Sequence, residues 1–274
     1  MSPRSRAEAA GSVPERRDVY ERLADELRHG ITSGRYRPGD RLPSTLELME
    51  RTGVANLTVR GAYRMLVEEG LVEPVAKKGF YVRRPSAMTW RMNPPPGRRA
   101  GAGMLDGWAG DAEAAGLAHR EEVSVAIEDS SVPVLGRPAG ERLGLEPGSR
   151  VLVRRAIRYT GPPGDEPPMA AQSLADEYYP YDLVRDSALA SPGPASPAEA
   201  LAALGYRVRG HADELLPRLA TTEERRLMSL PQVSVVLEVA RTAHAADRTP
   251  VLVLHQVRRG DGATFTYDII YPGR

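Results

Sequence analysis

The side chains best suited to chemistry form a short row that begins at Asn56. Asn56, Arg60 and Arg64 recur every four residues, so we expect them on one face of a helix, with Leu57 and Thr58 in its first turn. An Asn amide matches the edge of adenine, an Arg guanidinium matches guanine or a phosphate, and Leu57 or Thr58 can contact a thymine methyl group. The row therefore predicts recognition of a DNA duplex. The alternative is an ordinary solvated helix face.

Three helices and a two-stranded ribbon are predicted to position this row. Apolar periodicity and turn residues place helices at 19–31, from 44 to about 52, and at 56–69, and strands at 71–75 and 79–82. Ser44 and Glu47 fit the S-x-x-E capping box, and Gly53 is expected to take a positive φ. A helix fits the major groove and a basic ribbon can follow the adjacent backbone, so the segment is predicted to be a winged helix–turn–helix. The expected DNA contacts are Arg41, Ser44, Thr45, Asn56, Leu57, Thr58, Arg60, Arg64, Lys77, Lys78 and Gly79.

The composition is typical of a chain with two ordinary domains and no membrane segment. It has 274 residues and no cysteine, which removes disulfides and thiolate metal sites. No run approaches the ~18 apolar residues of a membrane span, and the N-terminus lacks the apolar core of a secretory signal. We expect a cytoplasmic protein with no metal, no cofactor and no membrane partner.

Shifts in composition divide the chain into four parts. Residues 1–15 are expected to be a flexible arm, 16–84 the winged helix–turn–helix, 85–108 a linker rich in Pro, Arg and Gly, and 109–274 a second domain. Residues 15–85 carry 14 basic and 11 acidic side chains, net +3, whereas residues 86–274 carry 21 and 24, net −3. A cationic first domain suits DNA, although an excess of this size also arises by chance.

The second domain is predicted to be α+β. Strands are expected at 122–127, 150–159, 170–175, 234–242, 249–257 and 263–270, and helices at 138–143, 180–186, 197–204 and 222–230, the last capped by Thr222. The five histidines lack metal-ligand spacing, and neither a G-x-S-x-G elbow nor a phosphate-binding glycine loop occurs. An enzyme is therefore disfavoured. A DNA-binding protein without an effector is also disfavoured, because the second domain is larger than dimerisation alone requires.

Residues 20–83 resemble the winged-helix domain of the GntR family of bacterial repressors. The matching residues include Leu23, Leu27, Ile31, Gly34, Pro38-Gly39, Leu42-Pro43-Ser44, Leu48, Gly53-Val54, Thr58-Val59-Arg60, Ala62, Leu66, Glu69-Gly70-Leu71 and Gly79. The family often has Arg where Leu46 stands and Ser-Arg where Ala55-Asn56 stands, and in relatives those arginines contact DNA. The resemblance therefore implies an altered half-site, in which Asn56 either shifts the preference from guanine toward adenine or takes over the helix cap.

From about residue 110 to 270 the chain resembles the UTRA effector domain of the HutC-like subfamily. The landmarks, in order, are GERLGLEPGSRVLVRRAIRY, EYYPYDLV, LAALGYRV, LPRLATTEERRLMSL, SVVLEVARTAH and TPVLVLHQVRRGD. The resemblance implies a mixed α/β fold similar to chorismate lyase, a homodimer formed through this domain, and a pocket for a small-molecule effector. It implies effector contacts at Arg155, Arg158, Glu177, Tyr178, Arg241, His255 and Tyr267.

Three positions depart from relatives that sense sugar phosphates. Ala156 stands where those relatives carry a second arginine, and Ala175 and Leu252 stand where they carry acidic residues. A phosphate needs Arg or backbone N–H partners, whereas an apolar pocket suits an uncharged ligand. We therefore expect a repressor that an effector other than a sugar phosphate releases from an inverted-repeat operator. The alternative is that Arg154 or Arg155 replaces the lost arginine.

Overall fold

The computed structural model describes residues 13–75, 78–83, 88–93, 105, 107–161, 163, 170–193 and 195–269. The chain divides into two compact units, of which the first holds Met1–Pro85 with Pro231–Val233 and the second holds Ser86–Leu230 and Ser234–Arg274. No helix in these described ranges is long and apolar enough to cross a membrane.

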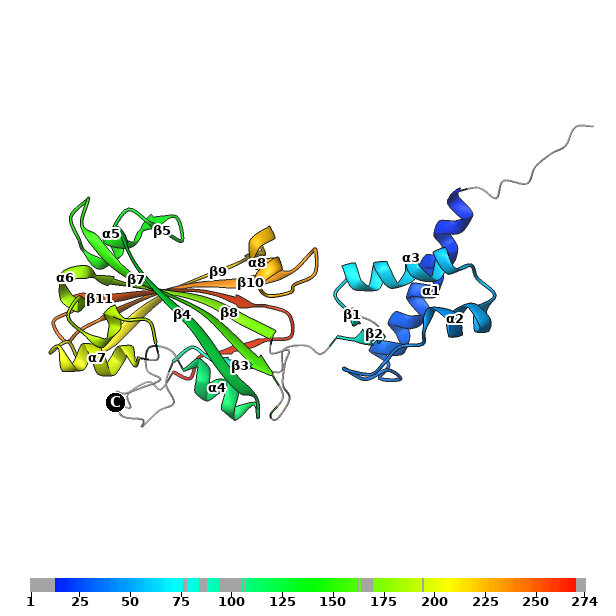
Figure 1. Cartoon of the computed structure of the whole chain (residues 1–274), viewed down its shortest axis with the longest axis horizontal. Coiled ribbons are helices and arrows are strands. Elements are labelled where there is room, and N and C mark those ends of the chain that lie inside the picture. Colours follow the sequence, from blue (N-terminus) through cyan, green and yellow to red (C-terminus); the bar gives the residue numbers. More distant parts are fainter. Residues whose placement is uncertain are drawn as a thin grey trace, which may run out of the picture. The chain divides into compact units, whose positions relative to one another are not determined.

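The described residues of the first unit form three helices and a two-stranded antiparallel ribbon (Figure 1). Its elements are α1 (Val13–Thr32), α2 (Thr45–Thr52), α3 (Asn56–Glu68), β1 (Val72–Val75) and β2 (Gly79–Val82). α1 begins at Val13, not at 19, and so takes in the end of the predicted arm; residues 1–12 lie outside the described residues. The earlier start has a local reason, because Pro14 suits a first turn and the following Glu and Arg residues favour a helix without adding apolar periodicity.

One apolar core holds the first unit together. Its buried residues are Leu23, Ala24, Leu27, Leu42, Leu48, Val59, Ala62, Tyr63, Leu66, Val72 and Val82. Tyr63 on α3 stacks on Phe80 of β2 with ring centroids 4.0 Å apart, and its hydroxyl donates to the carbonyl of Pro43. A single aromatic side chain therefore ties α3 both to the ribbon and to the segment before α2.

Local capping sets the two ends of α2. Ser44 Oγ accepts a hydrogen bond from Glu47 N at 3.2 Å, and Glu47 Oε2 accepts one from Ser44 N at 2.6 Å, which confirms the predicted capping box. The hydrogen bond from the Ser44 backbone also lowers the pKa of Glu47. Gly53 ends the helix at φ 69°, the left-handed conformation that glycine adopts without a steric penalty.

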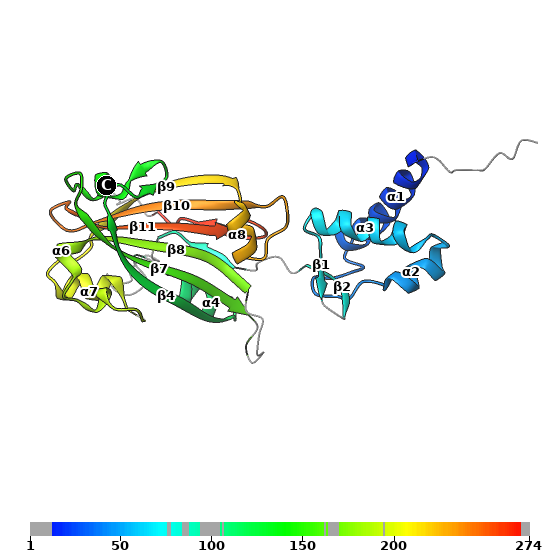
Figure 2. The same cartoon turned by 45° about the horizontal axis from the view of Figure 1, so that its top comes forward.

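The second unit is built on one antiparallel sheet of six strands in the order β4-β7-β8-β11-β10-β9 (Figure 2). These strands are β4 (Ala118–Asp129), β7 (Arg150–Gly161), β8 (Ala170–Pro180), β9 (Gly210–Leu219), β10 (Val235–His244) and β11 (Pro250–Arg259). The shorter elements are β3 (Thr89–Arg91), α4 (Trp108–Ala114), β5 (Pro133–Val134), β6 (Arg137–Pro138), α5 (Ala139–Leu143), α6 (Tyr181–Val184), η1 (Ala188–Ala190), α7 (Pro197–Ala203), α8 (Thr222–Leu227) and β12 (Thr264–Thr266). α4 and α7 lie on one face of the sheet, and α5 and α8 lie on the other (Figure 1).

The predicted linker at 85–108 is not linker throughout. Met88, Trp90 and Met92 alternate with exposed residues, are buried, and form part of a core with Trp108. β3, which contains Trp90, pairs in parallel with β12. This alternation of apolar residues is a strand signal that the surrounding Pro, Arg and Gly residues obscured.

Two other local features of the second unit differ from the prediction. β9 was not predicted because an edge strand exposes much of both faces and so loses the apolar alternation that identifies a strand. The cap of α8 is Thr221, not Thr222: Thr221 Oγ1 accepts a hydrogen bond from Glu224 N at 3.2 Å, and the Thr221 N–H donates one to Glu224 Oε2 at 2.8 Å. The capping box therefore lies one residue earlier than predicted.

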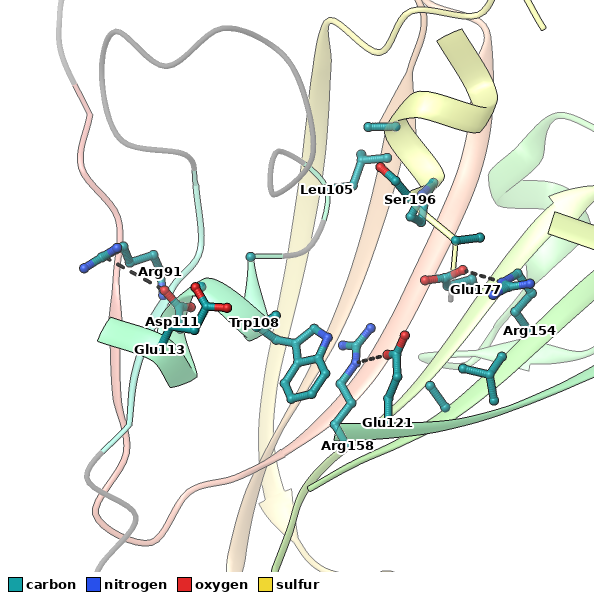
Figure 3. Close-up of a pocket in the computed structure, with 18 of the residues that line it drawn as sticks. Arg91, Leu105, Trp108, Asp111, Glu113, Glu121, Arg154, Arg158, Glu177 and Ser196 are labelled. Atoms are coloured by element: carbon teal, nitrogen blue, oxygen red, sulfur yellow. Dashed lines mark hydrogen bonds and ion pairs between the residues drawn. The ribbon is translucent and has the colours of Figure 1, made fainter. Parts of the chain in front are cut away.

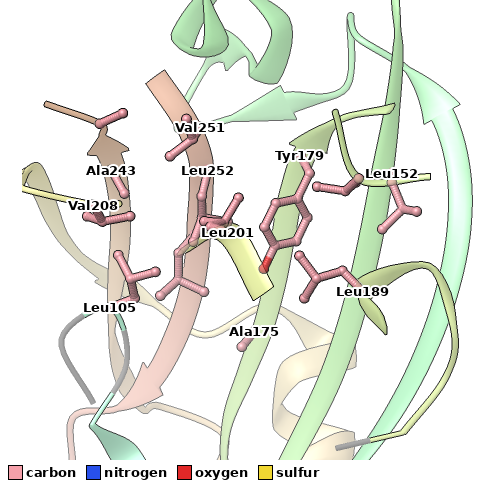
Figure 4. Packing of buried hydrophobic residues seen from close by; sticks show 13 residues of the cluster. Leu105, Leu152, Ala175, Tyr179, Leu189, Leu201, Val208, Ala243, Val251 and Leu252 are labelled. Carbon is pink, nitrogen blue, oxygen red and sulfur yellow. The ribbon is translucent and has the colours of Figure 1, made fainter. Parts of the chain in front are cut away.

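The largest core of the second unit lies between the sheet and the α6–α7 region (Figure 4). Tyr179 of β8 and Leu252 of β11 are fully buried there against Leu201 of α7 and Leu189 of η1. Because Leu201 belongs to α7, this packing holds the start of α7 above the neighbouring strands. The same placement forms one wall of the pocket described below.

Candidate DNA-binding face and ligand pocket

The exposed face of α3 carries the predicted reading residues. Asn56, Leu57, Arg60 and Arg64 are exposed, Thr58 is half-buried, and Val59, Ala62, Tyr63 and Leu66 face the core. Leu57 is 68 % exposed and Leu46 on α2 is 62 % exposed, although both are large apolar residues. Two exposed leucines beside a row of hydrogen-bonding side chains suit contact with thymine methyl groups.

The starts of α2 and α3 differ in how they are capped. Ser44 and Thr45 are half-buried, and the Ser44 hydroxyl is engaged in the cap of α2. The N-cap of α3 is Ala55, and it provides no side-chain hydrogen bond. Asn56 lies one position inside the helix, with its amide nitrogen 3.5 Å from the Met49 sulfur. The alternative in which Asn56 takes over the cap is therefore wrong.

The ribbon and the segment before α2 come together at Gly79. Arg41 forms an isolated bridge with Tyr81 of β2. A side-chain Cβ at Gly79, which has φ 106°, would lie 3.6 Å from Arg41 Nε, so the guanidinium passes close over this glycine. Lys78 beside it is exposed, and Lys77 lies outside the described residues. Arg41 and Lys78 thus sit at the same end of the ribbon.

The basic side chains of the first unit fall into two groups. Arg28 Nη2 lies 2.6 Å from Glu69 Oε1, and Arg51 Nη2 lies 3.1 Å from Glu26 Oε1. Within the described part of this unit, no ion pair is formed by the predicted DNA contacts Arg41, Arg60, Arg64 and Lys78. The second group is therefore the one suited to phosphates and bases.

The second unit holds a cavity of about 790 Å³, a size typical of small-molecule sites (Figure 3). Its floor is formed by β4, β7 and β8. One wall is formed by β3 and α4, and the other by the start of α7. The lining side chains used below are Arg91, Leu105, Trp108, Asp111, Glu113, Glu121, Val123, Arg154, Ala156, Arg158, Glu177, Pro197 and Ala198.

Two ion pairs, each with a buried arginine, lie in the floor of the cavity. Arg154 Nε is 3.4 Å from Glu177 Oε2, and Arg158 Nε is 3.5 Å from Glu121 Oε2. Glu177 Oε2 also accepts a hydrogen bond of 2.8 Å from the buried Tyr179 hydroxyl. Because both arginines are almost completely buried, the carboxylates offset the cost of removing their charges from water.

Arg154 and Arg158 have further partners of different kinds. Arg154 donates to the carbonyls of Leu189, Ser191 and Gly193 at 2.9, 2.8 and 2.7 Å. These carbonyls belong to the segment that leads into α7, so Arg154 holds a wall of the cavity in place. The Arg158 guanidinium lies 5.3 Å from the centre of the Trp108 ring, within the range of a cation–π contact.

The opposite wall carries its own charges. Asp111 on α4 is buried and accepts a 2.9 Å hydrogen bond from the backbone N–H of Arg91, whose Nε lies 4.0 Å from Asp111 Oδ1. Glu113 Oε1 lies 3.2 Å from His119 Nε2. The wall therefore adds two carboxylates and one guanidinium to the lining of the cavity.

The predicted effector contacts separate into three sets. Arg158 and Glu177 line the cavity, whereas Arg155, Tyr178 and His255 lie on the opposite face of the sheet. Arg155 Nη2 is 2.6 Å from Glu128 Oε1, and His255 Nε2 is 2.7 Å from Glu238 Oε1. The reason is the two-residue period of a strand, which turns Arg155 away from the face that carries Arg158.

Arg241 and Tyr267 form the third set, in a cluster behind the wall of the cavity. Arg241 donates to both oxygens of Asp213 at 2.7 Å, to the carbonyl of Leu105 at 2.8 Å and to the carbonyl of Met92. Tyr267 donates to Asp213 Oδ2 at 2.7 Å, and burial together with this carboxylate raises the pKa of Tyr267 to about 12. Burial would raise the pKa of Asp213, but the hydrogen bonds and charge of Arg241 outweigh it, so that pKa lies below its usual value.

Sequence reasoning missed several residues of the cavity. Arg154 was considered only as a substitute for the residue missing at Ala156, yet it shares a strand face with Arg158 because four residues separate them. The two-residue period of a strand could therefore have placed Arg154 on the same face as Arg158 from the sequence. Trp108 and Asp111 had no comparable signal, because they lie on a short helix at the edge of the predicted linker.

A winged helix–turn–helix followed by a sheet domain with a ligand-sized cavity defines a DNA-binding regulator. Residues 19–82 match the family described as "Bacterial regulatory proteins, gntR family", and residues 130–264 match the UTRA domain. The chain therefore belongs to the GntR family of helix–turn–helix regulators, in the HutC subfamily that carries a UTRA effector domain. It is a transcription regulator and not an enzyme.

Similar proteins extend over nearly the whole chain. An uncharacterized HTH-type transcriptional regulator of Streptomyces coelicolor is 27 % identical over 278 residues, covering 96 % of this chain and 95 % of that protein. The HTH-type transcriptional repressor NagR of Bacillus subtilis is 24 % identical over 253 residues, covering 91 % and 93 %. The crystal structure of PhnF from Mycobacterium smegmatis is 21 % identical, has a TM-score of 0.51 and covers 93 % of this chain and all of that chain (100 %), which shows a shared fold.

Proposed function

We propose that this protein is a cytoplasmic, homodimeric repressor that a small molecule releases from an inverted-repeat operator. In this proposal α3 enters the major groove, the ribbon follows the adjacent backbone, and the cavity of the second unit binds the effector. The observation that carries the proposal is one chain with both an exposed face of α3, on which Arg60 and Arg64 form no ion pair among the described residues, and a cavity of about 790 Å³. The named relative NagR is itself a repressor, which supports the same direction of control.

The coupling between effector and DNA is expected to pass along the start of the second unit. The wall of the cavity includes Arg91 on β3, only a few residues after the first unit ends at Pro85. An effector that contacts this wall acts on a chain segment that follows closely after the DNA-binding unit in the sequence. A coupling free energy of about 1–3 kcal/mol would change operator occupancy substantially.

We infer that the effector is not a sugar phosphate. Arg154 already donates to three carbonyls and pairs with Glu177, and Arg158 is paired with Glu121. Arg154 lies on the floor near Ala156, but its guanidinium is engaged with the carbonyls that hold the wall. It therefore does not replace a phosphate-binding arginine. Calorimetry with glucosamine 6-phosphate tests this point, and micromolar binding would refute it.

DNA binding can be tested with the full chain and the DNA upstream of its own gene. Footprinting is expected to find an inverted repeat with half-sites about one helical turn apart, and sedimentation is expected to find a dimer. Arg60→Ala should weaken the footprint while the protein stays folded. Protection of a single, unpaired half-site by a monomer would contradict the proposed dimeric repressor.

A DNA-binding protein without an effector is the competing function. That function assigns no ligand to the cavity, whereas the proposed repressor binds its effector there. A small-molecule screen by thermal unfolding separates the two, because a ligand at about 100 times its dissociation constant adds roughly 2.7 kcal/mol of stability. Compounds found in the screen are then tested for release of the operator, and a stabilising compound that leaves operator binding unchanged favours the competing function.

A further inference from the structure

The floor of the cavity has an ion pair at each end and an apolar strip between them. β7 turns Arg154, Ala156 and Arg158 to the same face, because strand side chains alternate. Across the sheet, Arg154 is registered with Glu177 of β8 and Arg158 with Glu121 of β4. At about 3.3 Å per residue along a strand, the four-residue interval between the two arginines corresponds to about 13 Å.

The middle of the floor is small and apolar. Ala156 is registered with Val123 of β4, and both line the cavity. Leu105, Pro197 and Ala198 supply apolar atoms to the walls (Figure 3 labels Leu105). A ligand body resting here exchanges water for carbon contacts, which favours an apolar group.

The charges around the cavity disfavour an anion. Among the residues that the structure describes, the lining carries three guanidinium groups and four carboxylates, a formal sum of −1: Arg91, Arg154 and Arg158 against Asp111, Glu113, Glu121 and Glu177. Each floor arginine already has a carboxylate within 3.5 Å. An anionic group that approached either arginine would therefore also approach a carboxylate in a partly desolvated site, and the like charges would repel.

We propose that the cavity takes an elongated, uncharged molecule with an apolar middle and a hydrogen-bonding group at each end; this rests on the function proposed above. The middle lies on Val123 and Ala156, and one end group reaches the Arg154–Glu177 pair. The other end group reaches the Arg158–Glu121 pair beside Trp108. Each pair presents a donor and an acceptor, so amide or hydroxyl ends match it, whereas a carboxylate or phosphate matches only half of it.

A matched pair of rod-shaped probes separates shape from charge. Biphenyl-4,4′-dicarboxamide and biphenyl-4,4′-dicarboxylate have nearly the same shape but differ by two negative charges. Calorimetry with the full chain is expected to show the dicarboxamide binding at least about 10-fold more tightly than the dicarboxylate. Benzamide, which can reach only one ion pair, is expected to bind at least about 10-fold more weakly than the dicarboxamide.

Two variants test the roles of the floor residues. Glu121→Gln removes the Glu121 carboxylate from beside Arg158, so the affinity for the dicarboxylate should rise by at least about 10-fold while that for the dicarboxamide changes little. Glu122→Gln is the matched control, because Glu122 pairs with Arg120 and Tyr159 away from the cavity and should change neither affinity. Ala156→Phe fills the apolar strip and should abolish dicarboxamide binding, with the unfolding temperature checking that the unit still folds.

The outcomes separate this inference from the proposed function. The inference is overturned if the dicarboxylate binds as tightly as the dicarboxamide, if neither probe binds the unaltered chain, or if Glu121→Gln leaves the charge preference unchanged. Release of the operator by glucosamine 6-phosphate would also overturn it while leaving the repressor function intact. Failure of the chain to bind any operator DNA would refute the repressor function whatever the probes do.

Discussion

Replacing Arg241 with methionine should strongly destabilise the second unit. Arg241 is 5 % exposed, and its guanidinium forms two hydrogen bonds with Asp213 and two with the carbonyls of Met92 and Leu105. Methionine approximates the length of the aliphatic part but supplies no donor. Among the residues that the structure describes, Asp213 would then keep the Tyr267 hydroxyl at 2.7 Å and His211 at 3.8 Å.

The expected loss follows from the carboxylate that the substitution leaves behind. Removing one partner of a buried ion pair typically costs about 3–5 kcal/mol, because the other charge stays buried without compensation. The two carbonyls also lose donors, but losses within one cluster do not add, so about 3–5 kcal/mol is the total expected. For a unit of this size the loss lowers the unfolding temperature by roughly 6–20 °C. Arg155→Met is the matched control. The Arg155 side chain is 40 % exposed, so loss of its ion pairs should cost only about 0–1 kcal/mol of stability.

Urea unfolding followed by tryptophan fluorescence measures this loss selectively. Both tryptophans, Trp90 and Trp108, belong to the second unit, so the signal reports on that unit alone. The double variant Arg241→Met with Asp213→Leu should recover part of the stability, since no charge is then left buried. A loss below about 1 kcal/mol for Arg241→Met, or no recovery in the double variant, would refute the view that this cluster holds the wall of the cavity.

Three further predictions concern the first unit. Arg60→Ala should weaken specific operator binding by at least about 1 kcal/mol in fluorescence anisotropy, and unchanged affinity would show that α3 is misassigned as the reading helix. Lys77→Ala with Lys78→Ala should lower the slope of log affinity against log salt by at most about 2 units, with little effect on sequence preference; a lost preference would assign them base contacts instead. Ser44→Ala should cost about 1 kcal/mol in thermal unfolding at pH 7. Because Glu47 has a lowered pKa, its contribution to the capping box is present above its usual value of 4.5 and is lost as the pH falls through the lower folded value. Replacing Glu47 with alanine should therefore cost less stability in acid than at pH 7, and a cost that does not fall with the pH would contradict the capping-box explanation.

Local signals in the sequence were sufficient for the first unit. The capping box at Ser44 and Glu47 and the turn at Gly53 are set by residues within a few positions of each other, so short-range chemistry determines them. The face of α3 follows from its 3.6-residue period, which buries Val59 and leaves Arg60 exposed. Even here the cap of α3 was not decided locally, because Asn56 is engaged with Met49 of the preceding helix.

The second unit depends on pairings that no local pattern specifies. Strand β3 was assigned to a linker, although it pairs with β12 from the other end of the domain. The effector contacts implied by family resemblance lie on both faces of the sheet, because side chains alternate along a strand. Arg158 faces the cavity and Arg155 faces away from it. Sequence separation explains the difference, since a contact between distant strands depends on the whole sheet.

The sequence by itself determined the family, the order of most helices and strands, and which face of α3 meets solvent, because residue type and period carry that information. Only the tertiary structure decided that Arg154 and Arg158 are each matched by a carboxylate and that Arg241 holds a wall together and does not line the cavity. The physical reason is that the availability of a buried charge depends on its neighbours in space. These neighbours come from strands and loops that lie far apart in the chain.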